Sequence, residues 1–299
     1  MRQEGEKMEY ALKLEKVSKT YKASGFSLRN VSMEVPAGSI VGFVGENGAG
    51  KSTTIGCILN TLFRDGGSVK IFGEEMSDKD TGLRERIGVV YDGDNFPGYY
   101  SARQVASVMR GIYRQWDDAL FSSYLSQFGL DPSQKIKTYS KGMTMKLAVA
   151  AALSHHPDLL ILDEATSGLD PAMREEILDI FLDFIGEEER AVLLSSHITT
   201  DLERIADYIT FIHEGRILLT EEKDEILYRY GILRCEEDTF AAMDKRDWLA
   251  WRRRGFQFDV LVKDRRAAAR KYAGEVIDHA SIEETMLLLA KGERNERIA

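Results

Sequence analysis

The sequence predicts an α/β fold with a largely parallel sheet, a helical insertion and a small α+β appendage at the C-terminal end. Two observations support this prediction. Short, continuous apolar runs, which are typical of buried parallel strands, alternate with helical segments. A glycine-rich loop also joins the first of these runs to a helix. The four runs are residues 40–44, 159–162, 191–195 and 208–213.

The other elements follow in chain order. Residues 10–35 alternate apolar and polar side chains, which is the period of a strand. A turn at 36–38 precedes the first buried strand, and the helix after the glycine-rich loop begins near Ser52. Further strands are predicted at 69–72 and 87–91, a helical subdomain at about 93–155, and helices at 173–185 and 200–206.

The character of the sequence changes near residue 220. Helix-like and strand-like pieces follow at 239–252, 256–262 and 265–272. Ser281 and Glu284 have the spacing of a capping box, which predicts a last helix ending near Gly292. We therefore expect a main domain at residues 1–220 and an accessory or regulatory domain at 221–299.

Composition excludes several classes of protein. The 299 residues hold 40 Lys+Arg and 49 Asp+Glu, a net charge of −9, which argues against a general nucleic-acid binder. Two cysteines are too few for a disulfide scaffold. No apolar run approaches the ~20 residues that cross a bilayer, so we expect a cytoplasmic protein.

A phosphate site is predicted in the glycine-rich loop at residues 45–52, which fits G-x-x-x-x-G-K-[ST] in full. Its backbone N–H groups and the following helix N-terminus point at a β-phosphate. Lys51 is expected to bridge the β- and γ-phosphates, and Ser52 to ligate Mg²⁺. The expected nucleotide contacts in this segment are Gly45, Asn47, Gly48, Ala49, Gly50, Lys51, Ser52 and Thr53.

Two carboxylates follow the apolar run at 159–162. The strand is expected to place Asp163 beside the phosphate loop, where it can hold Mg²⁺ through water. Glu164 is the expected general base for the attacking water. This pattern downstream of a phosphate loop favours nucleotide hydrolysis over a strand that ends in acidic surface residues.

The ordered motifs over residues 10–220 resemble the ATP-binding-cassette (ABC) ATPases. Residues 139–143, Tyr-Ser-Lys-Gly-Met, stand where the family has its Leu-Ser-Gly-Gly-Gln signature. Residues 167–170 match the D-loop, and His197 matches the switch histidine. Tyr21 falls where the family places an aromatic side chain that stacks on adenine.

The resemblance implies a P-loop NTPase cassette with a mixed RecA-like core sheet, an antiparallel β subdomain and a helical subdomain. It also implies a head-to-tail dimer, a homodimer or a pair with a similar chain, that binds two ATP molecules. Ser140 and Gly142 would then hold the γ-phosphate of the partner subunit's ATP. His197 would contact the γ-phosphate beside Glu164, and Asp170 would cross the dimer interface.

The sequence departs from the family pattern at several positions. Lys141 replaces the first signature glycine, Met143 replaces the glutamine, and Ala165 stands where proline often follows the catalytic glutamate. Asp92 stands where the family has its Q-loop glutamine. An aspartate can also ligate Mg²⁺ or its water, although it is one methylene shorter.

The leading interpretation is the ATP-hydrolysing subunit of a bacterial exporter-type ABC transporter. It would drive a separate integral membrane permease and lie at the inner face of the cell membrane. One alternative is an ABC ATPase that acts on nucleic acid or ribosomes, although the net charge does not favour a nucleic-acid partner. Another is an ATP-gated regulatory dimer whose residues 221–299 restrain the dimer or contact a partner.

Two weaker features leave alternatives open. The aromatic loop at 95–100 either receives a helix of the permease or belongs to the subdomain core. Trp248, Trp251 and the arginines at 252–254 suit nucleic acid or an anionic lipid surface. We favour a helix with buried tryptophans and a solvated charged face, because nearby acidic residues dilute the basic patch.

Overall fold

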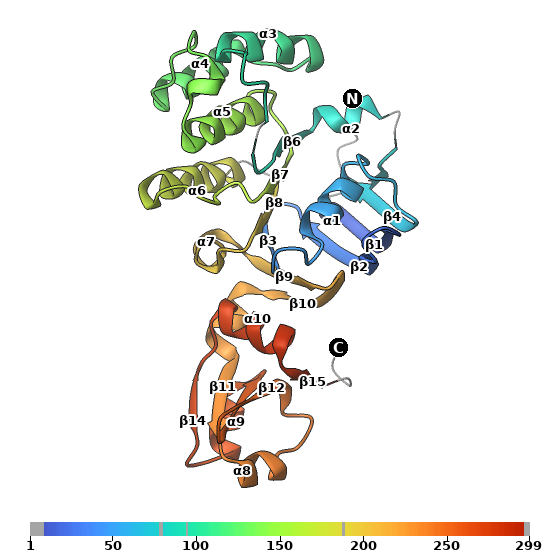
Figure 1. Ribbon diagram of the computed structural model, residues 1–299, viewed down its shortest axis with the longest axis vertical. Helices are drawn as coiled ribbons and strands as arrows, with labels where there is room; N and C mark the ends of the chain where they lie inside the picture. The colour runs from blue at the N-terminus through green and yellow to red at the C-terminus, as the bar shows by residue number, and fades with distance from the viewer. Residues whose placement is uncertain (1–8, 78–79, 94, 187–188, 296–299) are drawn as a thin grey trace.

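The computed structural model describes residues 9–77, 80–93, 95–186 and 189–295. A central sheet lies between a group of helices at one end of the long axis and a second α/β unit at the other (Figure 1). Among the described residues, every helix is too short or too polar to cross a bilayer.

The central sheet has six strands in the order β10-β9-β3-β8-β7-β6. β3 is parallel to β8 and β9, β7 is parallel to β6 and β8, and β10 is antiparallel to β9. Every residue of β3, β7 and β8 is buried, which confirms the predicted continuous apolar strands. The strands are β3 Ile40–Val44, β6 Ile87–Val90, β7 Leu159–Asp163, β8 Ala191–Ser196, β9 Tyr208–His213 and β10 Arg216–Glu222.

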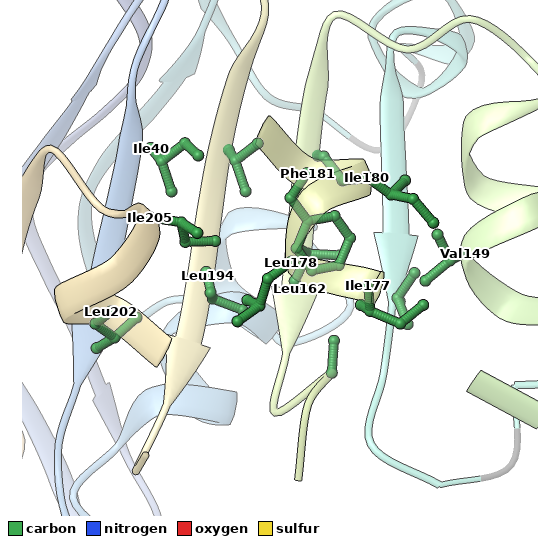
Figure 2. Packing of buried hydrophobic residues seen from close by; sticks show 14 of the residues in the cluster. Ile40, Val149, Leu162, Ile177, Leu178, Ile180, Phe181, Leu194, Leu202 and Ile205 are labelled. Carbon is green, nitrogen blue, oxygen red and sulfur yellow. The ribbon is translucent and has the colours of Figure 1, made fainter. Parts of the chain in front are cut away.

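Helices cover one face of this sheet. Ile177 and Phe181 of α6 (Pro171–Ile185) pack in one cluster with Leu162 and Leu194 of the strands (Figure 2). α7 (Thr199–Ile205) adds Leu202 to the same cluster. Burial of these side chains fixes the sheet and therefore the position of its carboxyl edge.

The opposite face packs on α1 (Lys51–Ile58) and on an antiparallel sheet with the order β2-β1-β4-β5. This sheet is the antiparallel β subdomain that the resemblance implies. Its strands are β1 Tyr10–Thr20, β2 Ser27–Pro36, β4 Gly66–Ile71 and β5 Glu74–Glu75, and the short α2 (Thr81–Glu85) follows them.

The helical insertion contains α3 (Ala102–Ile112), α4 (Asp118–Gln127), the 3₁₀ turn η1 (Ile136–Thr138) and α5 (Lys141–Leu153). Local capping explains where these helices begin. Ser101 and Gln104 form a capping box at α3, and Asp117 accepts two backbone N–H bonds at α4. Ser140 accepts from the Met143 N–H and caps α5. The predicted helical subdomain is thus confirmed as helices.

The C-terminal unit is a five-stranded antiparallel sheet with the order β14-β11-β13-β12-β15. The capping box at Ser281 and Glu284 is present, and its helix α10 ends at Gly292 as predicted. The elements are the π-helical turn η2 (Glu225–Arg229), β11 Gly231–Cys235, α8 Glu237–Ala242, β12 Trp248–Arg254, β13 Gln257–Val262, α9 Arg265–Lys271, β14 Val276–His279, α10 Ile282–Lys291 and β15 Glu293–Arg294.

The prediction of a helix around Trp248 and Trp251 is wrong. Helix α8 ends at Ala242, and both tryptophans lie on β12, which pairs with β13. The register of β12 against β13 shifts between Trp248 and Ala250, and the two residues pack in different buried clusters. This irregularity places Trp248 and Trp251, three residues apart, in the same cluster. The expected burial is confirmed for Trp248, whereas Trp251 is only half-buried, and both pack in a cluster with Phe258.

The C-terminal unit packs directly on the rest of the chain. The boundary expected at residue 220 falls within β10, which continues to Glu222. Leu288 and Leu289 of α10 belong to the same buried cluster as α6 and β7. The backbone N–H of Ile282 also donates to Glu203 of α7 at 3.3 Å. The unit is therefore fixed against α7 and does not hang from a free linker.

Candidate functional site

A hollow of about 580 Å³ opens at the carboxyl edge of the central sheet. Four segments that are far apart in the sequence meet there: the β1–β2 loop, the phosphate loop, the end of β6 and the end of β7. The lining residues are Tyr21, Ser24, Phe26, Glu46, Asn47, Gly48, Gly50, Lys51, Ser52, Thr53, Asp92, Asp163 and Glu164. Most of the predicted site residues are thus brought together.

The phosphate loop is shaped by its backbone. Gly50 precedes α1 with φ +117°, a conformation that side chains rarely allow. Gly45 and Ala49 do not line the hollow. Instead the Gly45 carbonyl accepts from Lys51, and the Ala49 N–H donates to the Glu46 carbonyl at 3.1 Å. These two predicted residues therefore hold the loop closed around the others.

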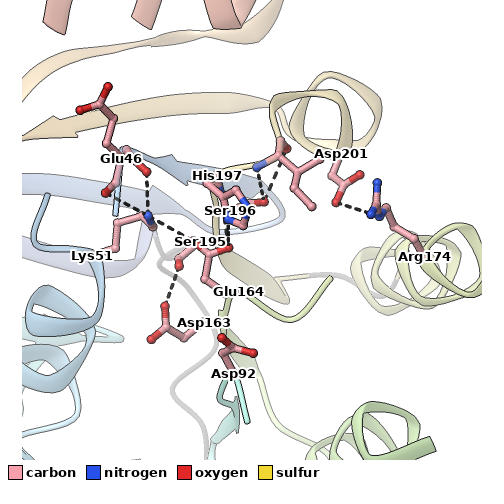
Figure 3. Close-up of polar contacts among 12 residues, drawn as sticks. Glu46, Lys51, Asp92, Asp163, Glu164, Arg174, Ser195, Ser196, His197 and Asp201 are labelled. Atoms are coloured by element: carbon pink, nitrogen blue, oxygen red, sulfur yellow. Dashed lines mark hydrogen bonds and ion pairs between the residues drawn. The ribbon is translucent and has the colours of Figure 1, made fainter. Parts of the chain in front are cut away.

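Lys51 is buried, with 6% of its surface exposed, and its ammonium group is held by three oxygens. Nζ donates to the Gly45 carbonyl at 2.7 Å and lies 3.1 Å from Oε1 of Glu164 (Figure 3). The Glu46 carbonyl lies further away, at 3.4 Å. A buried ammonium group needs such partners, and phosphate oxygens can replace them.

Glu164 stands directly after β7 in a left-handed conformation, with φ +53°. Non-glycine residues rarely adopt this conformation, and those that do cluster at functional sites. Its Oε2 lies 2.6 Å from Nδ1 of His197, which follows β8. Glu164 is therefore held between Lys51 and His197, the two other residues that were predicted to be catalytic (Figure 3).

Three oxygen-bearing side chains in the hollow suit a divalent cation. Asp163 is buried and accepts from the Ser195 hydroxyl at 2.7 Å, which fixes its carboxylate. Ser52 and Asp92 line the same hollow. Mg²⁺ is typically bound through one or two carboxylates together with substrate phosphates, so this donor set fits the ion.

The signature residues lie elsewhere. Ser140 is exposed at the N-cap of α5, outside the lining of the hollow. Gly142 is buried, and a Cβ at this position would overlap the sulfur of Met173 in α6. The structure therefore does not bring Ser140 and Gly142 to the hollow of their own chain. Their predicted contact to the nucleotide of a partner subunit stays a prediction.

Sequence reasoning missed several residues around the site. Phe26 lines the hollow next to Tyr21, with ring centroids 6.5 Å apart. Ser195 fixes Asp163, and its place at the end of an apolar strand before His197 was the available signal. No motif indicates Phe26, because its position depends on how β1 and β2 pair.

Asp201 of α7 is a further buried group close to the site. Burial raises the pKa of its carboxyl group. The Arg174 guanidinium lies 3.9 Å away and also donates to the Leu169 carbonyl at 3.2 Å (Figure 3). This contact links the helix after the switch histidine to the D-loop.

The family model described as "ABC transporter" matches residues 28–167. The chain is 34% identical over 217 residues to the lantibiotic transport ATP-binding protein SrtF of Streptococcus pyogenes, which covers 71% of this chain and 91% of that protein. It is 33% identical over 213 residues to the bacitracin transport ATP-binding protein BcrA of Bacillus licheniformis, over 71% and 69% of the two chains.

Solved structures give the same fold. An ATP-binding subunit of an ABC transporter matches with a TM-score of 0.66 and 27% identity, over 72% of this chain and 91% of that chain. A dimeric cassette with bound ADP and phosphate matches with a TM-score of 0.64 and 24% identity, over 71% and 98%.

The fold, the converging motifs and these relatives agree. Lys51, Asp163 and Glu164 line the same hollow, and the relatives are bacterial transport ATP-binding proteins. The chain belongs to the ABC transporter ATP-binding family and is an ATP-binding and ATP-hydrolysing subunit that works with a separate membrane permease.

Proposed function

We propose that this subunit hydrolyses ATP between two head-to-tail cassettes and thereby drives a permease from the inner face of the cell membrane. The observation that carries this proposal is the separation of the two halves of the site. The phosphate loop and carboxylates line one hollow, whereas Ser140 lies exposed outside it. The exposed N-terminus of α5 is then available to the phosphates of a nucleotide bound by a partner subunit.

Each site residue has a proposed role. Lys51 and the loop N–H groups bind the β- and γ-phosphates, and Tyr21 stacks on adenine. Ser52, Asp92 and Asp163 hold Mg²⁺, which neutralises phosphate charge when bound. Asn47, Gly48 and Thr53 complete the lining of the phosphate site.

Proton transfer falls to the residues after β7 and β8. Glu164 is placed to accept a proton from the attacking water, and His197 holds its carboxylate at 2.6 Å. Lys51 is paired with the same carboxylate at 3.1 Å. When phosphate oxygens replace Glu164 as the partner of Lys51, the carboxylate is released from this ion pair and can accept a proton from the attacking water.

The permease is proposed to dock beside the helical subdomain. An apolar hollow of about 290 Å³ lies between α2, β6 and α3, lined by Leu59, Thr61, Met76, Thr81, Arg84, Glu85, Ile87, Val89, Tyr91, Ile112 and Tyr113. Tyr99 and Ile112 are 67% and 59% exposed. Phe96 and Tyr100 pack on the core instead, so the aromatic loop supports both interpretations left open by the sequence.

Residues 221–299 are proposed to form an accessory domain that regulates the site. Nζ of Lys291 lies 3.1 Å from Oε1 of Glu46 in the phosphate loop. The backbone N–H of Ile282 donates a hydrogen bond to Glu203 on α7, the helix that follows His197. The C-terminal unit therefore touches two segments that carry catalytic residues.

Dimerisation tests the shared site. We expect Glu164→Gln protein to form a stable dimer with ATP and Mg²⁺ in light scattering, because nucleotide is bound and not consumed. Adding Ser140→Arg should abolish the dimer. Ser126→Arg, at an exposed serine of α4, is the matched control and should leave the dimer intact.

The permease is tested by purification of the tagged chain from native membranes in mild detergent. A stoichiometric polytopic protein should accompany the wild type and be lost with Tyr99→Asp. Recovery from the soluble fraction with nucleic acid or ribosomes would contradict the transporter proposal, and so would a Glu164→Gln protein that stays monomeric at every ATP concentration even with the permease present.

A further inference from the structure

Two departures from the family pattern lie in contact with each other. Nζ of Lys141, in the signature position that is usually glycine, lies 3.3 Å from Oδ1 of Asp92, in the position that is usually glutamine. Both side chains are about half exposed. The two positions are far apart in the sequence, and the fold brings them together at the start of α5 and the end of β6.

The D-loop also shapes this contact. A Cβ added at Gly168 would lie 3.0 Å from Nζ of Lys141 and 3.4 Å from its Cδ. The side chain of Lys141 therefore crosses over the D-loop on its way to Asp92. The signature, the D-loop and the end of β6 meet at this one side chain.

The charges of the two departures cancel. An aspartate adds one negative charge to a hollow that already holds Asp163 and Glu164 and must accept a triphosphate. A lysine 3.3 Å away adds one positive charge. The pair carries the same net charge as the neutral glutamine and glycine of the family pattern.

We propose that Lys141 is a positioning residue that holds and neutralises Asp92 before Mg²⁺ arrives. Without Mg²⁺, Lys141 screens ATP from the Asp92 carboxylate. Lys141 would give up that carboxylate to a bound Mg²⁺, and α5 would then lose its ion pair with the end of β6. The inference rests on the proposed placement of Asp92 beside bound ATP.

This arrangement predicts opposite effects on two binding constants. Lys141→Gln leaves the Asp92 charge uncompensated, so ATP affinity in EDTA should fall about two- to fivefold, the range of an exposed ion pair. The same change removes the competitor of Mg²⁺, so the affinity for Mg²⁺ should rise. This rise would appear as a lower Mg²⁺ concentration at half-maximal turnover. A merely structural loss would weaken both.

The experiment measures ATP binding by calorimetry in EDTA, and turnover against Mg²⁺ concentration, for four proteins: wild type, Lys141→Gln, Asp92→Asn and the double variant. In the Asp92→Asn background, Lys141→Gln should change neither constant. Arg110→Gln is the control, because it breaks an ion pair of similar exposure with Asp118 in the helical subdomain.

Two results would overturn the inference: equal effects of Lys141→Gln in both backgrounds, or a loss of both affinities together. Equal effects would mean that Lys141 attracts ATP directly. Failure of the proposed function would look different, because Glu164→Gln protein would then form no ATP-dependent dimer in light scattering, whatever the two binding constants of Lys141→Gln.

Discussion

The central sheet and the C-terminal sheet bury charged side chains in different settings. At the carboxyl edge of the central sheet, Lys51 and Asp163 are buried, with 6% and 7% of their surface exposed. In the C-terminal unit, aromatic and aliphatic side chains fill most of the interior, and ion pairs such as Arg246 with Asp244 lie outside it. Its buried carboxylate, Asp259, is 8% exposed and lies 3.6 Å from the guanidinium of Arg234 in the same unit. Burying charge costs free energy unless a partner of opposite charge compensates it. A bound triphosphate would do so for the ammonium group of Lys51. We therefore place the proposed chemistry at the first sheet and expect the second to act through its packing.

The largest expected effect is at the edge of the central sheet. Glu164→Gln keeps the shape of the side chain but removes the base, so turnover should fall about 10²- to 10⁴-fold with ATP affinity retained. A steady-state ATPase assay with a separate binding measurement tests this. Glu189→Gln, at another glutamate with positive φ, is the control that should retain activity. Near-normal turnover by Glu164→Gln would mean that another residue is the general base.

The second prediction concerns the packing of the C-terminal unit. Leu288 of α10 is buried in the cluster shared with α6, so Leu288→Ala should lower the free energy of unfolding by about 2–5 kcal/mol. Leu182→Ala, at a position that is 41% exposed, should cost much less. Denaturant unfolding measures both. Equal small effects would show that Leu288 is not buried in solution.

The third prediction uses a buried histidine of the cassette. His155 stacks on Tyr113 at 3.9 Å, and burial lowers its pKa. An unfolded histidine has a pKa near 6.5, so the unfolded chain takes up a proton first. Stability from this group is therefore full above about pH 6.5 and is lost as the pH falls, by at most about 1.4 kcal/mol per pH unit.

Unfolding curves at several pH values test this. His155→Gln should flatten the pH dependence below 6.5, whereas His279→Gln, at an exposed histidine of the C-terminal unit, should leave it unchanged. If both variants keep the wild-type slope, another group is responsible for the acid sensitivity.

The smallest expected effect lies where the two units meet. Lys291→Gln removes an exposed ion pair with Glu46, so stability should change by less than about 1 kcal/mol. ATP affinity should still shift by a few-fold, because Glu46 lines the ATP hollow. Lys271→Gln breaks a pair within the C-terminal unit and should leave ATP affinity unchanged. Identical ATP affinities for both variants would speak against regulation through this contact.

The sequence predicted the cassette well because each of its motifs ties a residue type to a position at a strand end. The run 159–162 indicated both a buried strand and the place of Asp163 and Glu164. The C-terminal unit has no such motif. Trp248 and Trp251 are three apart, which fits a helix, and only pairing with β13 shows that they lie on a strand. The contact of Lys141 with Asp92 depends on tertiary packing, which no local pattern reports.

The close approach of Gly142 to Met173 has one more consequence. It leaves no space between the first turn of α5 and the first turn of α6, so neither can slide toward the other. Asp170 caps α6 directly beside this contact. In the proposed dimer, a pull on the signature of one subunit would therefore displace its D-loop as well. A movement at one ATP site of the dimer would then be transmitted to the other ATP site.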